Sequence, residues 1–204
     1  DSSQNRWLGQ MDFADIKDIK EKVGEEIKAI APRYRSSRKL RYNGREENFN
    51  LIATTPDFRE IYGLKPARGR FLTKMDLENF HQVIVLGHET AVNVFKEEKA
   101  LGKKINLEGM TFTVVGILPQ DYESSILPVS INDNRGFIPL SVMERLRGIE
   151  NRFNLLVRTK NRNLLESVKA KTKEILNVRH GLTARGRSKF NFHNLAQGLD
   201  MVNI

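Results

Sequence analysis

The segment "VIVLGHETAVNVFKEEKALGKKINLEGMTFTVVG", Val83 to Gly116, predicts a strand, a helix and a hairpin in close succession. Its first five residues, VIVLG, form a short apolar run that indicates a buried strand. The following HETAVNVF predicts a short helix that buries Ala91, Val92 and Phe95. Residues 103–120 predict a hairpin, because a turn glycine divides them and alternate residues after it are apolar. The centre of the chain is therefore expected to combine α and β structure.

Towards the N-terminus, apolar residues at helical spacing predict a helix from Asp12 to Val23. Gly24 follows it, where a left-handed residue commonly ends a helix. The next stretch, "IKAIAPRYRSSRKLRY", contains Pro32 and is interpreted as an irregular extended segment. Asn43-Gly44 then gives a strong hairpin signal, because both residues tolerate positive φ. Residues 56–63, "PDFREIYG", predict one or two helical turns between a proline and a glycine.

Towards the C-terminus, "GFIPLSVMERLRG" predicts a strand that leads into a helix. A further strand is expected at residues 152–159, an amphipathic helix at residues 164–176, and a closing strand at residues 189–195. Strands and helices do not alternate regularly along the chain, as they would in a doubly wound fold. The sequence predicts the α+β class with mixed sheets.

Charge and composition restrict the possible functions. The 204 residues contain no cysteine, which excludes a disulfide framework, thiol catalysis and cysteine-bound zinc. The net charge is +9, and residues 151–204 account for most of it, with 11 basic and 3 acidic side chains, or +8. This distribution leaves open a nucleic-acid-binding patch at residues 179–189. Few aromatic residues accompany the basic ones, so the stacking surface that nucleic-acid binding commonly uses is weak.

No motif in the sequence predicts a catalytic, cofactor-binding or metal-binding residue. The glycine-rich stretch "GLKPARGRFL", Gly63 to Leu72, fails as a phosphate-binding loop, because five residues separate its glycines and no Gly-Lys-Ser/Thr follows. It is interpreted as a structural corner in which Gly69 bends and Phe71 is buried. Neighbouring carboxylates diverge on a helix or strand and make poor acid/base pairs. The other residues considered and set aside are His81, His88, His180, His193, the loop Asn132–Asn134, and the pairs Glu25-Glu26, Glu46-Glu47 and Glu97-Glu98.

Six short motifs occur in a fixed order: P-D-F, G-R-F, V-x-V-L-G, L-G-K-x-I, F-T-V-V-G and F-I-P-L-S. In this order and spacing the chain resembles the extracytoplasmic core domain of MacB-type ABC transporter permeases, a group that includes LolC/LolE-like lipoprotein-releasing proteins. The resemblance covers about Asp12 to Leu195 and is densest from Thr55 to Leu146.

The resemblance implies a two-part fold. A porter-like α/β subdomain is expected from residues 1–55 and 137–204, and an inserted, strand-rich (Sabre-like) subdomain from residues 56–136. It also implies a position on the periplasmic side of the inner membrane, between two membrane helices that the given sequence does not include. Residues near Asp1 and Ile204 are therefore expected to lie at the same end of the domain.

The resemblance further implies a non-catalytic role. The domain is expected to transmit ATP-driven motion across the membrane for export of a peptide, drug, lipid or lipoprotein, and the MacB-like efflux branch is favoured over lipoprotein release. ATP and Mg²⁺ belong to an associated nucleotide-binding domain, and no cofactor is expected in this one. The implied partners are a second permease copy, the ATP-binding subunit or domain, and possible adaptor and outer-membrane channel proteins. A nucleic-acid-binding module and an enzyme with an unrecognised site remain the alternatives.

Overall fold

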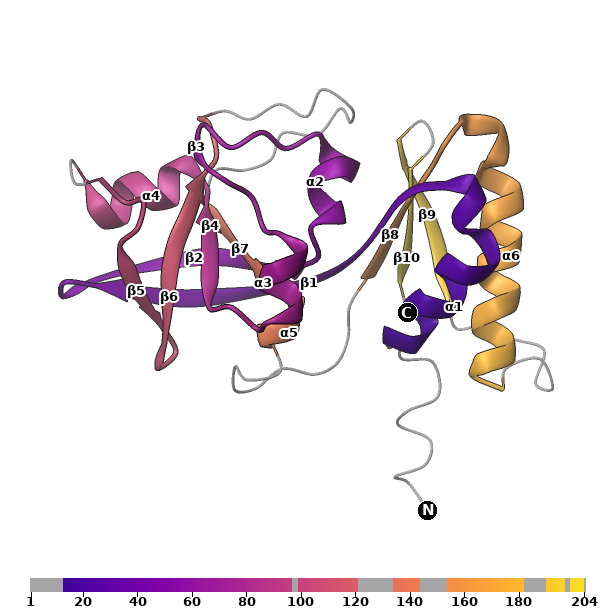
Figure 1. Cartoon of the computed structure of the whole chain (residues 1–204), viewed down its shortest axis with the longest axis horizontal. Helices are drawn as coiled ribbons and strands as arrows, with labels where there is room; N and C mark the ends of the chain where they lie inside the picture. The colour runs from indigo at the N-terminus through magenta and orange to yellow at the C-terminus, as the bar shows by residue number, and fades with distance from the viewer. Residues whose placement is uncertain are drawn as a thin grey trace, which may run out of the picture. The chain divides into compact units, whose positions relative to one another are not determined.

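Figure 1 shows the computed structural model of the chain, which describes residues 13–96, 99–120, 134–143, 154–181, 190–196 and 199–203. The chain packs into two compact units. The first unit combines residues Asp1–Ala31 with Glu150–Ile204, and the second comprises Pro32–Ile149. The expected proximity of the two chain ends concerns residues outside the described ranges.

These units differ in extent from the predicted subdomains. The second unit contains the whole predicted insertion, residues 56–136, and extends beyond it to Pro32 on one side and Ile149 on the other. Strand β2 (Arg45–Thr54), which the sequence assigns to the part built from the chain ends, lies in the second unit. There it pairs antiparallel with β1 (Ile27–Tyr42) and parallel with β7 (Arg135–Pro139). The assignment of a porter-like and a Sabre-like part to particular residues stays a prediction.

In the first unit, two helices accompany a group of strands (Figure 1). Helix α1 (Phe13–Val23) precedes a 3₁₀ turn at Gly24–Glu26, and α6 (Leu165–Arg179) follows β8 (Asn154–Thr159). Strand β10 (Leu199–Asn203) pairs antiparallel with both β8 and β9 (Asn191–Ala196). The buried side chains repeat at helical spacing, as the sequence predicts: Ile16, Ile19 and Val23 on α1, and Leu165, Val168, Thr172, Ile175 and Leu176 on α6.

In the second unit, six strands form a closed ring in the hydrogen-bonded order β2-β7-β4-β6-β5-β1, and β1 pairs again with β2. The ring contains parallel pairs (β2–β7 and β4–β6) as well as antiparallel ones, which confirms the mixed sheet and the α+β class. The bounds of its remaining elements are α2 Asp57–Tyr62, β3 Arg68–Gly69, α3 Lys74–Glu78, β4 Val83–Leu86, α4 His88–Phe95, β5 Lys104–Leu107, β6 Met110–Ile117, β7 Arg135–Pro139 and α5 Leu140–Met143.

The ring is filled by a continuous hydrophobic core. Its largest buried side chains include Phe49 from β2, Phe112 from β6 and Leu40 from β1. Side chains of α4, among them Val94 and Phe95, pack against the same core. Closing the ring leaves few unpaired strand edges in this unit, which limits unwanted strand pairing with other chains.

The predicted turns are confirmed at the level of individual backbone angles. Asn43 and Gly44 have φ values of 46° and 76° and join β1 (Ile27–Tyr42) to β2. Gly63 ends α2 with φ of 70°, and Gly109 turns β5 into β6 with φ of 89°. Each position requires a left-handed backbone, which glycine and asparagine adopt at low cost.

Two predictions about the backbone were wrong. The segment containing Pro32 is not irregular but belongs to one continuous strand, β1. Proline is tolerated there because the pairing of β1 with β2 begins only at the next residue, Arg33, so the ladder between these two strands needs no hydrogen bond from the proline nitrogen. Gly24 does not take a left-handed conformation, because the chain continues from α1 into a 3₁₀ turn.

Candidate functional site

The corner at Gly63–Leu72 packs against the end of β6. The backbone nitrogen of Ala67 donates to the carbonyl of Ile117 at 2.8 Å, and that of Arg70 donates to Val115 at 2.9 Å. Gly69 has φ of 70°, and Phe71 is buried. The interpretation of this stretch as a structural corner is confirmed.

Two glycines allow this close approach. A Cβ atom on Gly69 would lie 2.2 Å from the carbonyl oxygen of Val115, and one on Gly116 would lie 2.0 Å from that of Arg70. Both distances are far below a normal contact, so the two backbones can pair only because neither residue has a side chain.

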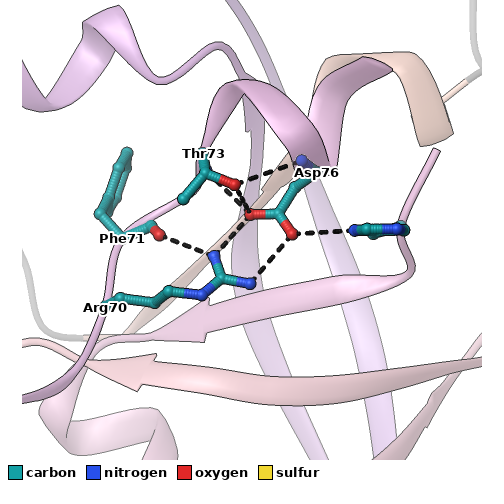
Figure 2. Close-up of polar contacts among 5 residues, drawn as sticks. Arg70, Phe71, Thr73 and Asp76 are labelled. Atoms are coloured by element: carbon teal, nitrogen blue, oxygen red, sulfur yellow. Dashed lines mark hydrogen bonds and ion pairs between the residues drawn. The ribbon is translucent and has the colours of Figure 1, made fainter. Parts of the chain in front are cut away.

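The corner ends in a cluster of polar side chains around a buried carboxylate, Asp76 (Figure 2). Arg70 binds it with both terminal nitrogens: Nη1 lies 2.5 Å from Oδ2, and Nη2 lies 3.0 Å from Oδ1. Thr73 donates to Oδ2 from its backbone nitrogen at 2.8 Å and from its hydroxyl at 2.7 Å. In return, the Asp76 nitrogen donates to the Thr73 hydroxyl at 3.3 Å, which completes a capping box at the start of α3. His81 Nδ1 lies 3.2 Å from Oδ1.

These contacts determine the charge of Asp76. Burial raises its pKa, but the hydrogen bonds from Arg70, Thr73 and His81 outweigh burial and lower the pKa to about 2. The carboxylate is therefore ionised at any physiological pH, and both of its oxygens already have donors. Such a group stabilises the corner and is poorly placed to act as an acid or a base. We refer to Arg70, Thr73, Asp76 and His81 as the Asp76 clamp.

A second clamp lies in the first unit, around the buried carboxylate of Asp15 on α1. Arg179, at the end of α6, places Nε 2.5 Å from Asp15 Oδ1 and Nη1 2.8 Å from Asp18 Oδ2. His180 Nε2 lies 3.0 Å from both oxygens of Asp15, and its ring packs edge-on against Phe190 with a centroid separation of 5.2 Å. We call Asp15, Asp18, Arg179 and His180 the Asp15 clamp. It joins two helices that are far apart in the sequence.

The Asp15 clamp bears on the proposed nucleic-acid patch at residues 179–189. Its first two residues, Arg179 and His180, contact carboxylates of α1 rather than stand free. Residues 182–189 lie outside the described ranges. In the part that the structure describes, the segment joins the end of α6 to α1.

The other residues considered from the sequence have structural roles where they are described. Asn134 links β2, β7 and α4, since its side-chain oxygen accepts from Thr90 at 3.2 Å and its amide donates to the Asn48 carbonyl at 3.2 Å. Glu26 pairs with Lys171, which lowers the pKa of Glu26. His88 lines a pocket beside α4. Glu46 pairs with Lys39 and Arg41, and Glu47 accepts from Asn93; Glu97-Glu98, Asn132 and the side chain of His193 lie outside the described residues.

Within the described ranges, no group of three or more His, Asp or Glu side chains could hold a metal ion. Among the helices that the structure describes, none is long and apolar enough to cross a bilayer. The sequence reasoning missed both clamps. Thr73-x-x-Asp76 carries a recognisable capping-box signal, whereas nothing local connects Asp15 with Arg179.

Comparison with known proteins places these features in a family. The model of the MacB-like periplasmic core domain matches residues 2–175. The chain is 25% identical over 209 residues to a macrolide export ATP-binding/permease protein MacB of Marinobacter nauticus, covering 100% of this chain and 30% of that protein. It is 23% identical over 191 residues to a protein of the same name from Bdellovibrio bacteriovorus, covering 93% of this chain and 29% of that protein. The chain thus spans less than a third of the length of these relatives.

Solved structures share the fold. The extracellular domain of the noncanonic ABC-type transporter YknZ from Gram-positive bacteria superimposes with a TM-score of 0.73 and 18% identity, covering 95% of this chain and 89% of that one. The periplasmic region of MacB from Actinobacillus actinomycetemcomitans gives a TM-score of 0.72 and 20% identity, covering 97% of this chain and 81% of that one. The resemblance found in the sequence motifs is confirmed: this chain belongs to the family of MacB-like periplasmic core domains of ABC transporter permeases.

Proposed function

We propose that this domain transmits ATP-driven motion from the membrane to the extracytoplasmic side of an ABC transporter permease, and that it performs no reaction itself. The observation that carries the proposal is the Asp15 clamp. It fixes α1, the first described helix, to the far end of α6 through a buried carboxylate that two side chains hold. A force applied to α1 is therefore passed to α6 and the strands around it.

The clamp has the physical properties that force transmission requires. Asp15 is fully buried, so separating α1 from Arg179 and His180 removes these partners from a carboxylate that lies away from water. Breaking one partner of a buried ion pair typically costs about 3–5 kcal/mol. The interface between α1 and α6 is consequently stiff compared with contacts made by exposed pairs, which contribute about 0.2–1 kcal/mol. Rigid-body motion needs such stiff interfaces.

Membership of the family supports a proposal for the rest of the assembly. In the proposed assembly, membrane helices flank the domain, two permease copies pair, and a separate or fused nucleotide-binding domain holds ATP and Mg²⁺. The curated relatives are named for macrolide export, which favours an efflux function over lipoprotein release. The exported molecule is then a drug, peptide or lipid, and a periplasmic adaptor with an outer-membrane channel completes the path.

The test uses the full-length permease with its nucleotide-binding domain, reconstituted in lipid nanodiscs. Because residues 1–204 contain no cysteine, a single Lys20→Cys substitution on exposed α1 adds one spin label per copy within this domain. We expect the distance between the two labels of the dimer to change when ATP is trapped. Lys99→Cys provides the same measurement in the second unit. Unchanged distances at both positions would refute the proposed transmission.

A matched pair of variants tests the clamp itself. Asp15→Asn should preserve ATP hydrolysis in the reconstituted permease while lowering transport of a macrolide, because chemistry continues but motion is poorly passed on. Asp18→Asn, which changes a partly exposed member of the same clamp, should retain most transport. If Asp15→Asn instead lowers ATP hydrolysis and transport equally, and the label distances are the same as in the protein without this substitution, then Asp15 has a purely structural role.

A further inference from the structure

A pocket in the second unit lies along one face of α4. It encloses about 200 Å³ and is lined by residues of α4, β3 and the end of β6. His88, Ala91 and Val92 are its α4 residues, and their spacing places them on one side of the helix, while Lys96 directly follows the end of α4. The residues that complete the lining are Ala67, Arg68, Ala100, Ile117 and Leu118.

The lining of this α4 pocket combines apolar and polar surface. Ala91, Ala100 and Leu118 are buried, whereas Val92 is 46% exposed. The sequence predicts a buried Val92, since this residue continues the apolar pattern of α4, and the structure contradicts that prediction. An exposed valine in a pocket wall offers apolar surface to whatever enters, and covering it is favourable by the hydrophobic effect.

The charged residues of the pocket all have the same sign. Arg68 and Lys96 are cationic and exposed, and His88 lies in the lining with them. The lining includes no acidic side chain among the residues described. These three side chains also form no hydrogen bond or ion pair with any other residue, as far as the described chain shows. Among the residues that the structure describes, the rim of the pocket is therefore positive, and it would attract an anion.

The backbone at Lys96 supports a binding role. Its φ and ψ are 55° and −115°, a combination that glycine adopts with far less strain than a residue with a Cβ atom. Strained conformations of this kind concentrate at ligand-binding positions, where the surrounding structure maintains them. Here the strain ends α4 and leaves a cationic residue at the edge of the pocket.

We propose that the α4 pocket binds a small amphipathic anion: a carboxylate or phosphate headgroup with a short alkyl chain. Arg68 and Lys96 would contact the headgroup, and Ala91, Val92 and Ala100 would contact the chain. The pocket volume of about 200 Å³ leaves room for a small ligand of this kind. The proposal concerns the isolated domain and is independent of the proposed force transmission.

The test is a titration of the 204-residue chain, labelled with ¹³C at alanine methyls and followed by NMR. Ala67, Ala91 and Ala100 report on the pocket, and the buried Ala31 and Ala53 serve as internal controls. Octanoate and octyl phosphate should shift the NMR signals of the three pocket methyl groups, and the shifts should saturate. The ligand with the lower dissociation constant identifies the preferred headgroup. Octyltrimethylammonium and octanol, which have the same chain without negative charge, should bind about 10-fold more weakly or not at all.

Variants separate headgroup recognition from general adhesion of the alkyl chain. The double variant Arg68→Gln/Lys96→Gln should weaken octanoate binding by about 10-fold. Lys173→Gln, an exposed lysine on α6, should leave it unchanged and serves as the matched control. Val92→Ser should weaken the binding of octanoate and of octanol by the same factor, because it removes apolar surface from the pocket and leaves the charge of the pocket unchanged.

Three results would overturn the proposal. The first is equal binding of octanoate and octyltrimethylammonium, since charge would then play no part. The second is a shift of the Ala31 and Ala53 methyl signals together with those of the pocket, because this would indicate surface adhesion or unfolding. The third is no response to either anion together with saturable shifts from an acidic peptide, which would assign the pocket to a protein partner.

Discussion

Replacing Asp76 with asparagine should lower the free energy of unfolding of the second unit by about 2 kcal/mol at pH 7. The estimate follows from the pKa of this carboxyl, which the clamp lowers from 3.8 to about 2. One pKa unit corresponds to about 1.4 kcal/mol of differential stabilisation of the charged form. The side chain of Asp76 is only 1% exposed, so little of this energy is lost to screening by solvent.

The same pKa fixes the pH at which the effect disappears. Because the folded-state pKa lies below the unfolded-state value, the stabilisation is fully present above about pH 5 and is lost as the pH falls through 3.8 towards 2. The wild-type protein should therefore lose its advantage over Asp76→Asn between pH 5 and pH 2. Below pH 2 the two proteins should be equally stable with respect to this group.

Amide hydrogen exchange of the buried β6 residues Phe112 and Val114 measures this unit alone. Glu78→Gln is the matched control, because its pair with Lys74 is exposed on the same helix and should contribute less than about 0.5 kcal/mol. The reasoning fails if Asp76→Asn costs no more than this control at pH 7. It also fails if the cost at pH 2.5 equals that at pH 6.

Three further predictions concern packing and the other clamp. Gly116→Ala should destabilise the second unit by about 2 kcal/mol or more in urea unfolding, since its Cβ would overlap a backbone oxygen, whereas Gly24→Ala has open space and should be neutral or slightly stabilising. Asp15→Asn should destabilise the first unit by about 3 kcal/mol, and Asp18→Asn by less than about 1 kcal/mol, as measured by amide exchange in α6. Thr54→Val should cost about 1 kcal/mol by calorimetry, because a buried carbonyl loses the hydroxyl that donates to it at 2.6 Å.

The sequence predicted the fold best where a local rule determines the backbone. Asn43-Gly44 and Gly109 sit at turns that need positive φ, and both turns occur as predicted. The apolar spacing of α6 likewise predicts its buried face, although the helix continues to Arg179 beyond the last apolar residue of the pattern. Local chemistry and tertiary packing agree at these positions, so a single sequence suffices.

The sequence predicted poorly where the outcome depends on distant partners. The extended course of β1 through Pro32 depends on where β2 begins to pair, and the sequence around Pro32 does not contain that information. The exposure of Val92 depends on the space that β3 and β6 leave beside α4. The Asp15 clamp brings together residues 164 positions apart, which no periodic pattern can predict.

Each compact unit contains one buried carboxylate held by an arginine and a histidine: Asp15 in the first and Asp76 in the second. Pulling either clamp apart would take charged partners away from a buried carboxylate, at a cost on the order of 2–5 kcal/mol. Exposed pairs such as Lys17–Glu21 open for a few tenths of a kcal/mol. A load on the domain should therefore deform exposed contacts and connecting segments before it separates the clamped elements. For the proposed function this difference is essential, because a unit that yields internally would absorb the motion it has to pass on.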